Sequence, residues 1–231
     1  MNNADFNGFK PSAMLFLKEL EINNNRDWFT KNKIRYEDNV LIPALNYISA
    51  IGHELPVVSK HFTAIPKRLG GSIMRIYRDT RFSKDKTPYK TNIGIQFRHQ
   101  IAKDVHAPGY YVHVATNECF IGIGTWRPPS DALLKIREYI VEHPKKWVSA
   151  RDDKQFNKNF KLSGDKLKTA PRGFNKEHKL IDDLRWKDFI AIHNIDENDI
   201  QKVDFTKRTI ELFKSAESYM KFLCEAVGVP F

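Results

Sequence analysis

Three short segments in which every second residue is apolar constrain the fold of this 231-residue chain more than any other feature. The segments are residues 91–97, 109–115 and 119–125. A period of two is typical of a half-buried β-strand. Asn117-Glu118, between the last two segments, is typical of a hairpin turn. Residues 72–78, which are rich in β-branched and aromatic side chains and lack proline and glycine, predict a further strand. We therefore expect an antiparallel sheet of at least four strands.

The two faces of this predicted sheet differ in composition. One face carries Ile93, Ile95, Phe97, Val112, Val114, Ile121 and Ile123, and we expect it to belong to the core. The other face carries Asn92, Gly94, Gln96, Tyr111, His113, Gly122 and Gly124. The glycines leave room for a ligand, for the basic loop described below or for a helix to approach the backbone, and a simply solvated face is the alternative.

Helical patterns lie on both sides of the strands. Before the sheet, apolar residues recur with helical spacing over residues 12–22 and 26–55, with Ser12 and Asn24 or Asn25 as N-caps and a kink or break before Pro43. After the sheet, residues 130–143 (with Ser130 as N-cap), 145–161, 180–192 and 204–227 are predicted to be helical. The sequence thus predicts an α+β fold in a single domain over residues 1–231, its sheet packed against helices from both chain ends.

An unusual concentration of charge lies between the first two predicted strands. Residues 75–92 hold six basic and two acidic side chains, a local net charge of +4. A connection of about a dozen residues is longer than a hairpin turn, and loops of this length are usually functional or disordered. Arginine presents a planar fork of donors and lysine a point charge. The loop is therefore a candidate site for a compact anionic ligand, phosphorylated or carboxylated.

The candidate ligand-binding residues of this loop are Arg75, Arg78, Arg81, Lys84, Lys86, Tyr89 and Lys90. Arg75 and Arg78 are an odd number of positions apart, so within one strand they would point to opposite faces. Asp79 and Asp85 are candidate general bases, or they hold the arginines in place. His113, on the polar sheet face, is the third candidate for proton transfer. The structural alternative is an internal network of Arg–Asp pairs that fixes the loop.

Composition narrows the choice of partners and cofactors. The net charge of +10 favours anionic partners, among them phosphorylated or other anionic small molecules. A nucleic-acid-binding module is the weaker alternative, because no RNA- or DNA-binding signature occurs and the charge is concentrated in one loop. The sequence holds no nucleotide-binding glycine motif, nucleophile elbow or His-Glu-x-x-His motif, and we expect no cofactor.

The cysteines and the apolar runs bear on metal binding and location. Cys119 and Cys224 have no neighbouring cysteine or histidine at metal-ligand spacing, so we expect no metal site. Residues 1–10 lack the apolar run of a signal peptide, and no stretch is apolar enough to predict a membrane span. A reducing cytoplasm is the expected compartment.

Residues 75–92 read Arg-Ile-Tyr-Arg-Asp-Thr-Arg-Phe-Ser-Lys-Asp-Lys-Thr-Pro-Tyr-Lys-Thr-Asn. This stretch resembles the signature of an uncharacterised family, the domain of unknown function 2461 (DUF2461). Gly-Phe at residues 8–9, the Asn-Asn-Asn-Arg-Asp-Trp-Phe run at 23–29 and Pro-Arg-Gly-Phe at 171–174 resemble it too. The resemblance covers nearly the whole chain. It implies a soluble protein with no assigned activity, so it leaves open whether the protein is an enzyme.

Overall fold

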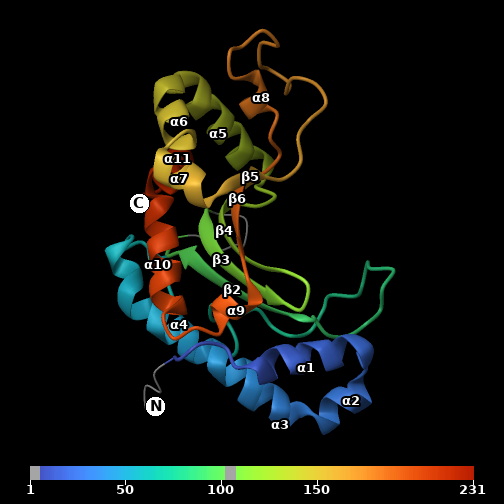
Figure 1. The fold of residues 1–231 in the computed structure, drawn as a ribbon. Helices are drawn as coiled ribbons and strands as arrows, with labels where there is room; N and C mark the ends of the chain where they lie inside the picture. The colour runs from blue at the N-terminus through green and yellow to red at the C-terminus, as the bar shows by residue number, and fades with distance from the viewer. Residues whose placement is uncertain (1–5, 102–107) are drawn as a thin grey trace.

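The structure is a computed structural model that describes residues 6–101 and 108–231. The interpretation of residues 1–10 therefore lies partly outside the described residues. Within the described ranges, six strands form one antiparallel sheet in the order β1-β2-β3-β4-β6-β5 (Figure 1). The strands are β1 (Phe62–Thr63), β2 (Asn92–His99), β3 (Gly109–Ala115), β4 (Cys119–Thr125), β5 (Lys161–Ser163) and β6 (Phe189–Ile195). The predicted α+β fold with an antiparallel sheet is confirmed.

Helices precede and follow the sheet along the chain. Those before it are α1 (Pro11–Ile22), α2 (Arg26–Lys31), α3 (Lys33–Tyr36) and α4 (Ile42–Glu54). Those after its first four strands are α5 (Ser130–Glu142), α6 (Pro144–Arg151), α7 (Lys154–Asn159), α8 (Ile181–Leu184), α9 (Glu197–Ile200), α10 (Phe205–Ser215) and α11 (Glu217–Ala226). The described helices include none that is long and apolar enough to cross a membrane.

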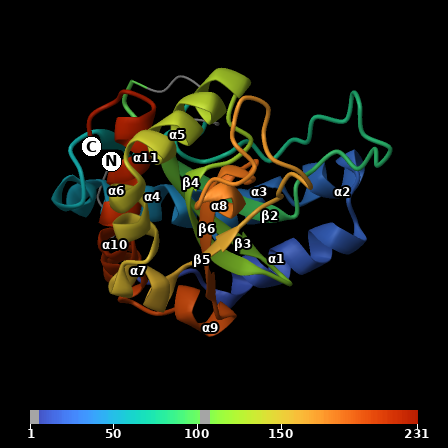
Figure 2. The same cartoon turned by 90° about the horizontal axis from the view of Figure 1, so that it is seen from above.

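The apolar face of the sheet packs against α4, α10 and α11, as Figures 1 and 2 show. The seven residues predicted for this face are at most 2 % exposed. Phe213 of α10 holds the layers together, with its ring centroid 5.9 Å from that of Phe97 and 4.2 Å from that of Tyr110. Complete burial of one such side chain contributes roughly 1.5–3 kcal/mol. Helices from both chain ends therefore cover one face of the sheet, as predicted.

The register of the strands determines which residues lie side by side on the opposite face of the sheet. Gly94 of β2 pairs with His113 of β3, and Tyr111 of β3 pairs with Gly122 of β4. Gly122 in turn pairs with Ile192 of β6. Because neighbouring paired residues point to the same side, the polar face predicted from the sequence continues into the apolar side chains of β6.

The sequence prediction missed three strands, the short β1 and β5 and the longer β6. Residues 180–192 are not one helix, because only Ile181–Leu184 is helical and Phe189–Ile195 forms β6 between β4 and β5. In β6, Phe189 and Ala191 are buried while Ile190 and Ile192 point to the opposite face. Both faces are thus apolar, and a continuous apolar run does not show the alternation that identifies a half-buried strand.

Several helix boundaries also differ from the prediction. Asn25 does cap α2, and its Oδ1 accepts a hydrogen bond of 2.9 Å from the backbone N–H of Trp28. A π-helical turn, Glu37–Leu41, directly precedes the start of α4 and places the predicted break before Pro43. Ser12 and Ser130 are not N-caps, since each lies inside its helix and neither caps it through its side chain. The last predicted helix is two helices, α10 and α11, separated at Ala216.

The strand predicted for residues 72–78 is reduced to two short pairings. Ile73 bridges Ile95 at the outer edge of β2, and Tyr77 bridges Tyr89 across the base of the charged loop. Two hydrogen bonds, from Met74 N–H to the carbonyl of Gly94 and from Gln96 N–H to that of Ser72, complete the first pairing. The chain then leaves the sheet edge, so the second half of the segment pairs within the loop and forms no regular strand.

Candidate functional site

The basic loop, residues 78–90, projects from the body of the protein, as Figures 1 and 2 show. Its two arms are joined by a 2.9 Å hydrogen bond from Arg78 N–H to the carbonyl of Pro88 and one of 2.7 Å from Lys90 N–H to that of Ile76. Asn24 clamps the base, since its side chain accepts from Tyr89 N–H at 3.0 Å and donates to the Tyr89 carbonyl at 2.9 Å. The base of the loop is therefore tied to the connection between α1 and α2.

Both acidic residues of the loop contact arginines. The guanidinium of Arg81 donates to both carboxylate oxygens of Asp79, at 2.9 and 2.7 Å. Arg78 contacts the carboxylate of Asp85 and the hydroxyl of Thr87. Hydrogen bonds from these arginines lower the pKa of Asp79 and of Asp85 to about 2. A carboxylate held in this way is a weak base near neutral pH, so the geometry favours a holding role over a general-base role.

The basic residues of the loop do not all converge. Arg81, Lys84 and Lys86 are exposed at the tip, where the Lys86 ammonium donates to the carbonyl of Thr80 at 2.9 Å. Arg75 is exposed before the loop. Three of the seven candidate ligand-binding residues, Arg78, Tyr89 and Lys90, line one cavity.

This cavity, the basal cleft, has a volume of about 360 Å³ and lies where the loop joins β2 and the end of α1. Its lining includes Glu21, Asn24, Arg78, Asp85, Thr87, Lys90 and Asn92. Lys90 is half-buried, and burial lowers its pKa, with the positive charge of Arg75 adding to the effect. In the part of the chain that the structure describes, no acidic group forms an ion pair with Lys90. The cleft thus contains an ammonium group that forms no direct ion pair with either carboxylate of the lining, Glu21 or Asp85.

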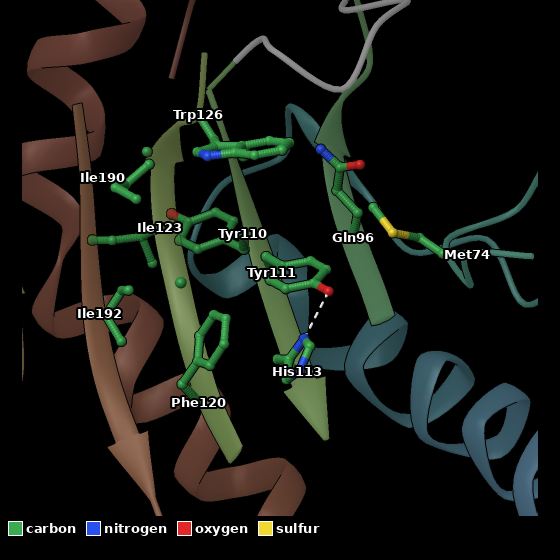
Figure 3. A pocket seen from close by; sticks show the side chains of 13 residues that line it. Met74, Gln96, Tyr110, Tyr111, His113, Phe120, Ile123, Trp126, Ile190 and Ile192 are labelled. Carbon is green, nitrogen blue, oxygen red and sulfur yellow. Dashed lines mark hydrogen bonds between the residues drawn. The ribbon is translucent and has the colours of Figure 1, made fainter. Parts of the chain in front are cut away.

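A second cavity, the sheet hollow, lies on the open face of β2, β3, β4 and β6 (Figure 3). It has a volume of about 440 Å³, within the usual range for small-molecule sites. Its walls are mainly apolar and aromatic, formed by Met74, Tyr111, Phe120, Trp126, Ile190 and Ile192. In Figure 3 the indole of Trp126 lies at the end of the hollow opposite His113.

His113 of the sheet hollow lies beside Asn92 of the basal cleft. Its Nδ1 is 3.0 Å from the hydroxyl of Tyr111 and 3.5 Å from the amide nitrogen of Asn92, which lines the basal cleft. Burial lowers the pKa of His113 and raises the pKa of Tyr111 to about 12, so both are neutral near pH 7. The amide nitrogen of Asn92 can only donate and the Tyr111 hydroxyl is also able to donate, which assigns Nδ1 as the acceptor and the ring proton to Nε2. The ring itself stacks on Phe120 at 4.7 Å.

The three glycines of the open face have three different roles. The nearest atoms to a Cβ at Gly122 would be those of the Phe120 ring and the Cβ of Tyr111, at 3.6 Å or more, so this glycine leaves the floor of the hollow open. A Cβ at Gly94 would lie 2.8 Å from the Tyr111 hydroxyl, so this glycine makes room for the contact with His113. Gly124 has a φ of +103° and its Cβ would lie 2.0 Å from the carbonyl oxygen of Phe189. Its role is to let β6 approach β4.

Sequence reasoning identified the loop and part of the open face but missed most of the hollow. Tyr111 and His113 were placed on the correct face by their alternation, whereas Trp126, Ile190 and Ile192 were not connected with it. The β-branched residues of 189–195 were a signal for a strand that could have found the wall formed by β6. Asn24 was interpreted only as a helix cap, and its contact with Tyr89 joins residues 65 positions apart.

The described residues contain no cluster of metal-binding side chains. Over residues 6–101 and 108–231, no three His, Cys, Asp or Glu side chains are placed to hold a metal ion. The two cysteines are buried and are not joined to each other. The polar groups that the structure does bring together are those of the basal cleft and the His113 junction.

The fold and the two cavities define an α+β protein with one sheet face covered by helices and the other hollowed beside a charged loop. Residues 12–222 match the family described as conserved hypothetical protein (DUF2461), and the chain belongs to this family. This confirms the resemblance drawn from residues 75–92. No curated protein and no solved structure matches the chain.

Proposed function

We propose that this protein binds a compact anion, phosphorylated or carboxylated, in the basal cleft. The observation that carries the proposal is Lys90, a half-buried ammonium without an acidic partner among the described residues and repelled by Arg75. A buried charge that lacks a partner is costly, and an anion that neutralises it would be bound favourably. Asn92 and Thr87 add hydrogen-bonding groups to the same cleft.

The carboxylates of the cleft limit what it can accept. Asp85 is engaged by Arg78, and Glu21 accepts a hydrogen bond from the hydroxyl of Thr116. Two cationic and two anionic side chains line the cleft, so its formal charges sum to zero. The lining as a whole therefore offers no net electrostatic attraction to a large polyanion. A small anion that reaches Lys90 and shares Arg78 with Asp85 fits this arrangement best. Arg81, Lys84 and Lys86 at the tip would attract such an anion through their field without touching it.

Catalysis on the bound anion would use His113. Its neutral imidazole lies beside Asn92 of the cleft and is oriented by the hydroxyl of Tyr111. A neutral histidine of this kind is suited to accept or relay a proton near pH 7. Asp79 and Asp85, with pKa values of about 2, would not compete with it for this role.

The test compares Lys90→Met with a matched variant at the tip, Lys84→Met, which removes the same charge outside the cleft. Binding of inorganic phosphate is measured by titration calorimetry at constant ionic strength adjusted with sodium chloride. We expect Lys90→Met to weaken binding at least about tenfold, or roughly 1.4 kcal/mol. Lys84→Met should change it less than about twofold. Equal losses in the two variants, or no binding of phosphate by the unaltered protein at millimolar concentration, would contradict the proposal.

A second candidate function is binding of single-stranded nucleic acid by the loop tip. The observation that favours it is Phe82, which is 96 % exposed and has the guanidinium of Arg81 5.8 Å from its ring. Exposed aromatic rings among basic residues bind single strands by stacking and charge. Here Phe82→Ala should weaken binding of a labelled single-stranded oligonucleotide in fluorescence anisotropy, while Lys90→Met should not. An unchanged affinity in Phe82→Ala would exclude this role for the tip.

A further inference from the structure

We infer that the sheet hollow receives a planar aromatic group carried by the anion of the basal cleft, so that the ligand class is an aromatic phosphate or carboxylate. This rests on the proposed function and assigns a role to the cavity beside it. The inference follows from the chemistry of the walls, from the open floor at Gly122 and from the junction at His113.

The walls of the hollow favour a flat ring. Phe120, Tyr111 and Trp126 present three aromatic side chains to it, and Trp126 is 50 % exposed at the opening. Ile190 and Ile192 close the side formed by β6. Aromatic rings attract one another in offset and edge-to-face arrangements beyond the effect of buried area alone. The volume of about 440 Å³ leaves space for a one- or two-ring group.

The floor of the hollow is open because Gly122 has no side chain. The neighbouring positions on this face are occupied by Tyr111 and Phe120, and a Cβ at Gly122 would lie 3.6 Å from the Phe120 ring and 3.8 Å from the Tyr111 Cβ, which are ordinary contact distances. A glycine at this strand position is not needed for close backbone approach, in contrast to Gly124. Since glycine weakens a strand, an open floor without a backbone requirement indicates space kept for a ligand.

The polar groups lie at one end of the hollow. The amide of Asn92 lines the cleft and His113 lines the hollow, and the two side chains are 3.5 Å apart. A ligand that spans this junction places its anionic group toward Lys90 and its ring toward Phe120 and Trp126. The neutral His113 and Tyr111 would then lie beside the bond between ring and anionic group.

Three probes test this inference by calorimetry: inorganic phosphate, 1-naphthyl phosphate and 1-naphthol. The unaltered protein should bind 1-naphthyl phosphate at least about tenfold more tightly than inorganic phosphate, and more tightly than 1-naphthol. Gly122→Val fills the floor with a residue that favours strands. It should remove the preference for 1-naphthyl phosphate while leaving the affinity for inorganic phosphate unchanged. Trp126→Ala, at the rim, should reduce the preference as well, and thermal melting checks the folding of both variants.

The outcomes separate this inference from the proposed function. Equal affinity for inorganic and naphthyl phosphate, or an unchanged preference in both Gly122→Val and Trp126→Ala, overturns the role of the hollow. In that case a loss of phosphate binding in Lys90→Met still supports the cleft. If 1-naphthol binds as tightly as 1-naphthyl phosphate, the link between hollow and cleft is overturned. Phosphate binding that does not depend on Lys90 contradicts the proposed function itself.

Discussion

The sheet hollow and the basic loop both border β2, but their side chains are held in place by different interactions. Most residues of the hollow belong to four strands, and the register fixes the spacing of these residues. Residues of the loop tip are held by solvent-exposed ion pairs. In the pair Arg81–Asp79, the two side chains are 76 % and 45 % exposed. Exposed ion pairs contribute little to stability. The comparison indicates that the precise geometry of this protein belongs to the sheet, while the loop supplies charge.

The largest effect that this comparison predicts is at Gly124. Gly124→Ala forces a side chain into a left-handed backbone conformation and against the carbonyl of Phe189, so pairing of β4 with β6 should be disrupted. We expect a loss of more than about 3 kcal/mol in the free energy of unfolding, measured by urea denaturation. Gly122→Ala is the matched control, in the same strand, and should change the free energy of unfolding by less than about 1 kcal/mol in either direction. Similar losses in the two variants would contradict the division of roles between these glycines.

A smaller effect is expected at the contact between Tyr111 and His113. Tyr111→Phe removes the hydroxyl, and Gly94→Ala displaces it, because the new Cβ would lie 2.8 Å from its oxygen. Each should cost roughly 0.5–1.5 kcal/mol, the net value of one hydrogen bond. The shift of the His113 Nδ1 resonance, measured by nitrogen NMR, should change in both variants. A resonance that stays in place in Tyr111→Phe would show that this hydroxyl does not orient the imidazole.

The smallest effect is expected at the loop tip and concerns acid titration. The pKa of Asp79 is lowered to about 2 by Arg81, so this pair favours the folded state at neutral pH and loses its effect as pH falls from 3.8 toward 2. In Arg81→Ala, the pKa of Asp79 should rise toward 3.8, while Asp85, held by Arg78, should still titrate near 2. Carbon NMR of the carboxyl groups measures both values. Because the pair is exposed and screened by water, the urea midpoint at pH 7 should decrease only slightly, and a large decrease would favour the loop as a structural network.

The sequence predicted the centre of the sheet well for a physical reason. The bounds predicted for β3 and β4 agree with the structure, because one face of these strands is core and the other carries polar residues or glycine. In β6 the second face is also apolar, since Ile190 and Ile192 line the hollow. The same feature that makes β6 part of the cavity therefore hid it from a search for alternation.

The charge of residues 75–92 identified the candidate loop, but it did not show which of its side chains lie together in space. Six basic residues in residues 75–92 identified the loop, yet which of them share a cavity depends on contacts distant in sequence. Asn24 ties Tyr89 to the connection between α1 and α2, and this places Lys90 in the cleft while Lys84 remains at the tip. A contact between residues this far apart in the chain is not predictable from local sequence patterns. The single-domain organisation, the anionic partner and the cytoplasmic location stay predictions.

The position of β6 has a consequence for how the protein is made. Thr125 pairs with Phe189, so everything between them, including α5, α6 and α7, must leave the ribosome before β4 gains its second neighbour. Contacts between residues so far apart form slowly, because a long loop must close first. Until then β4 is an unpaired edge on the nascent chain, and such edges are prone to aggregation. The sheet hollow would therefore be complete only late in synthesis, since the wall formed by Ile190 and Ile192 is among the last parts of the sheet to be synthesised.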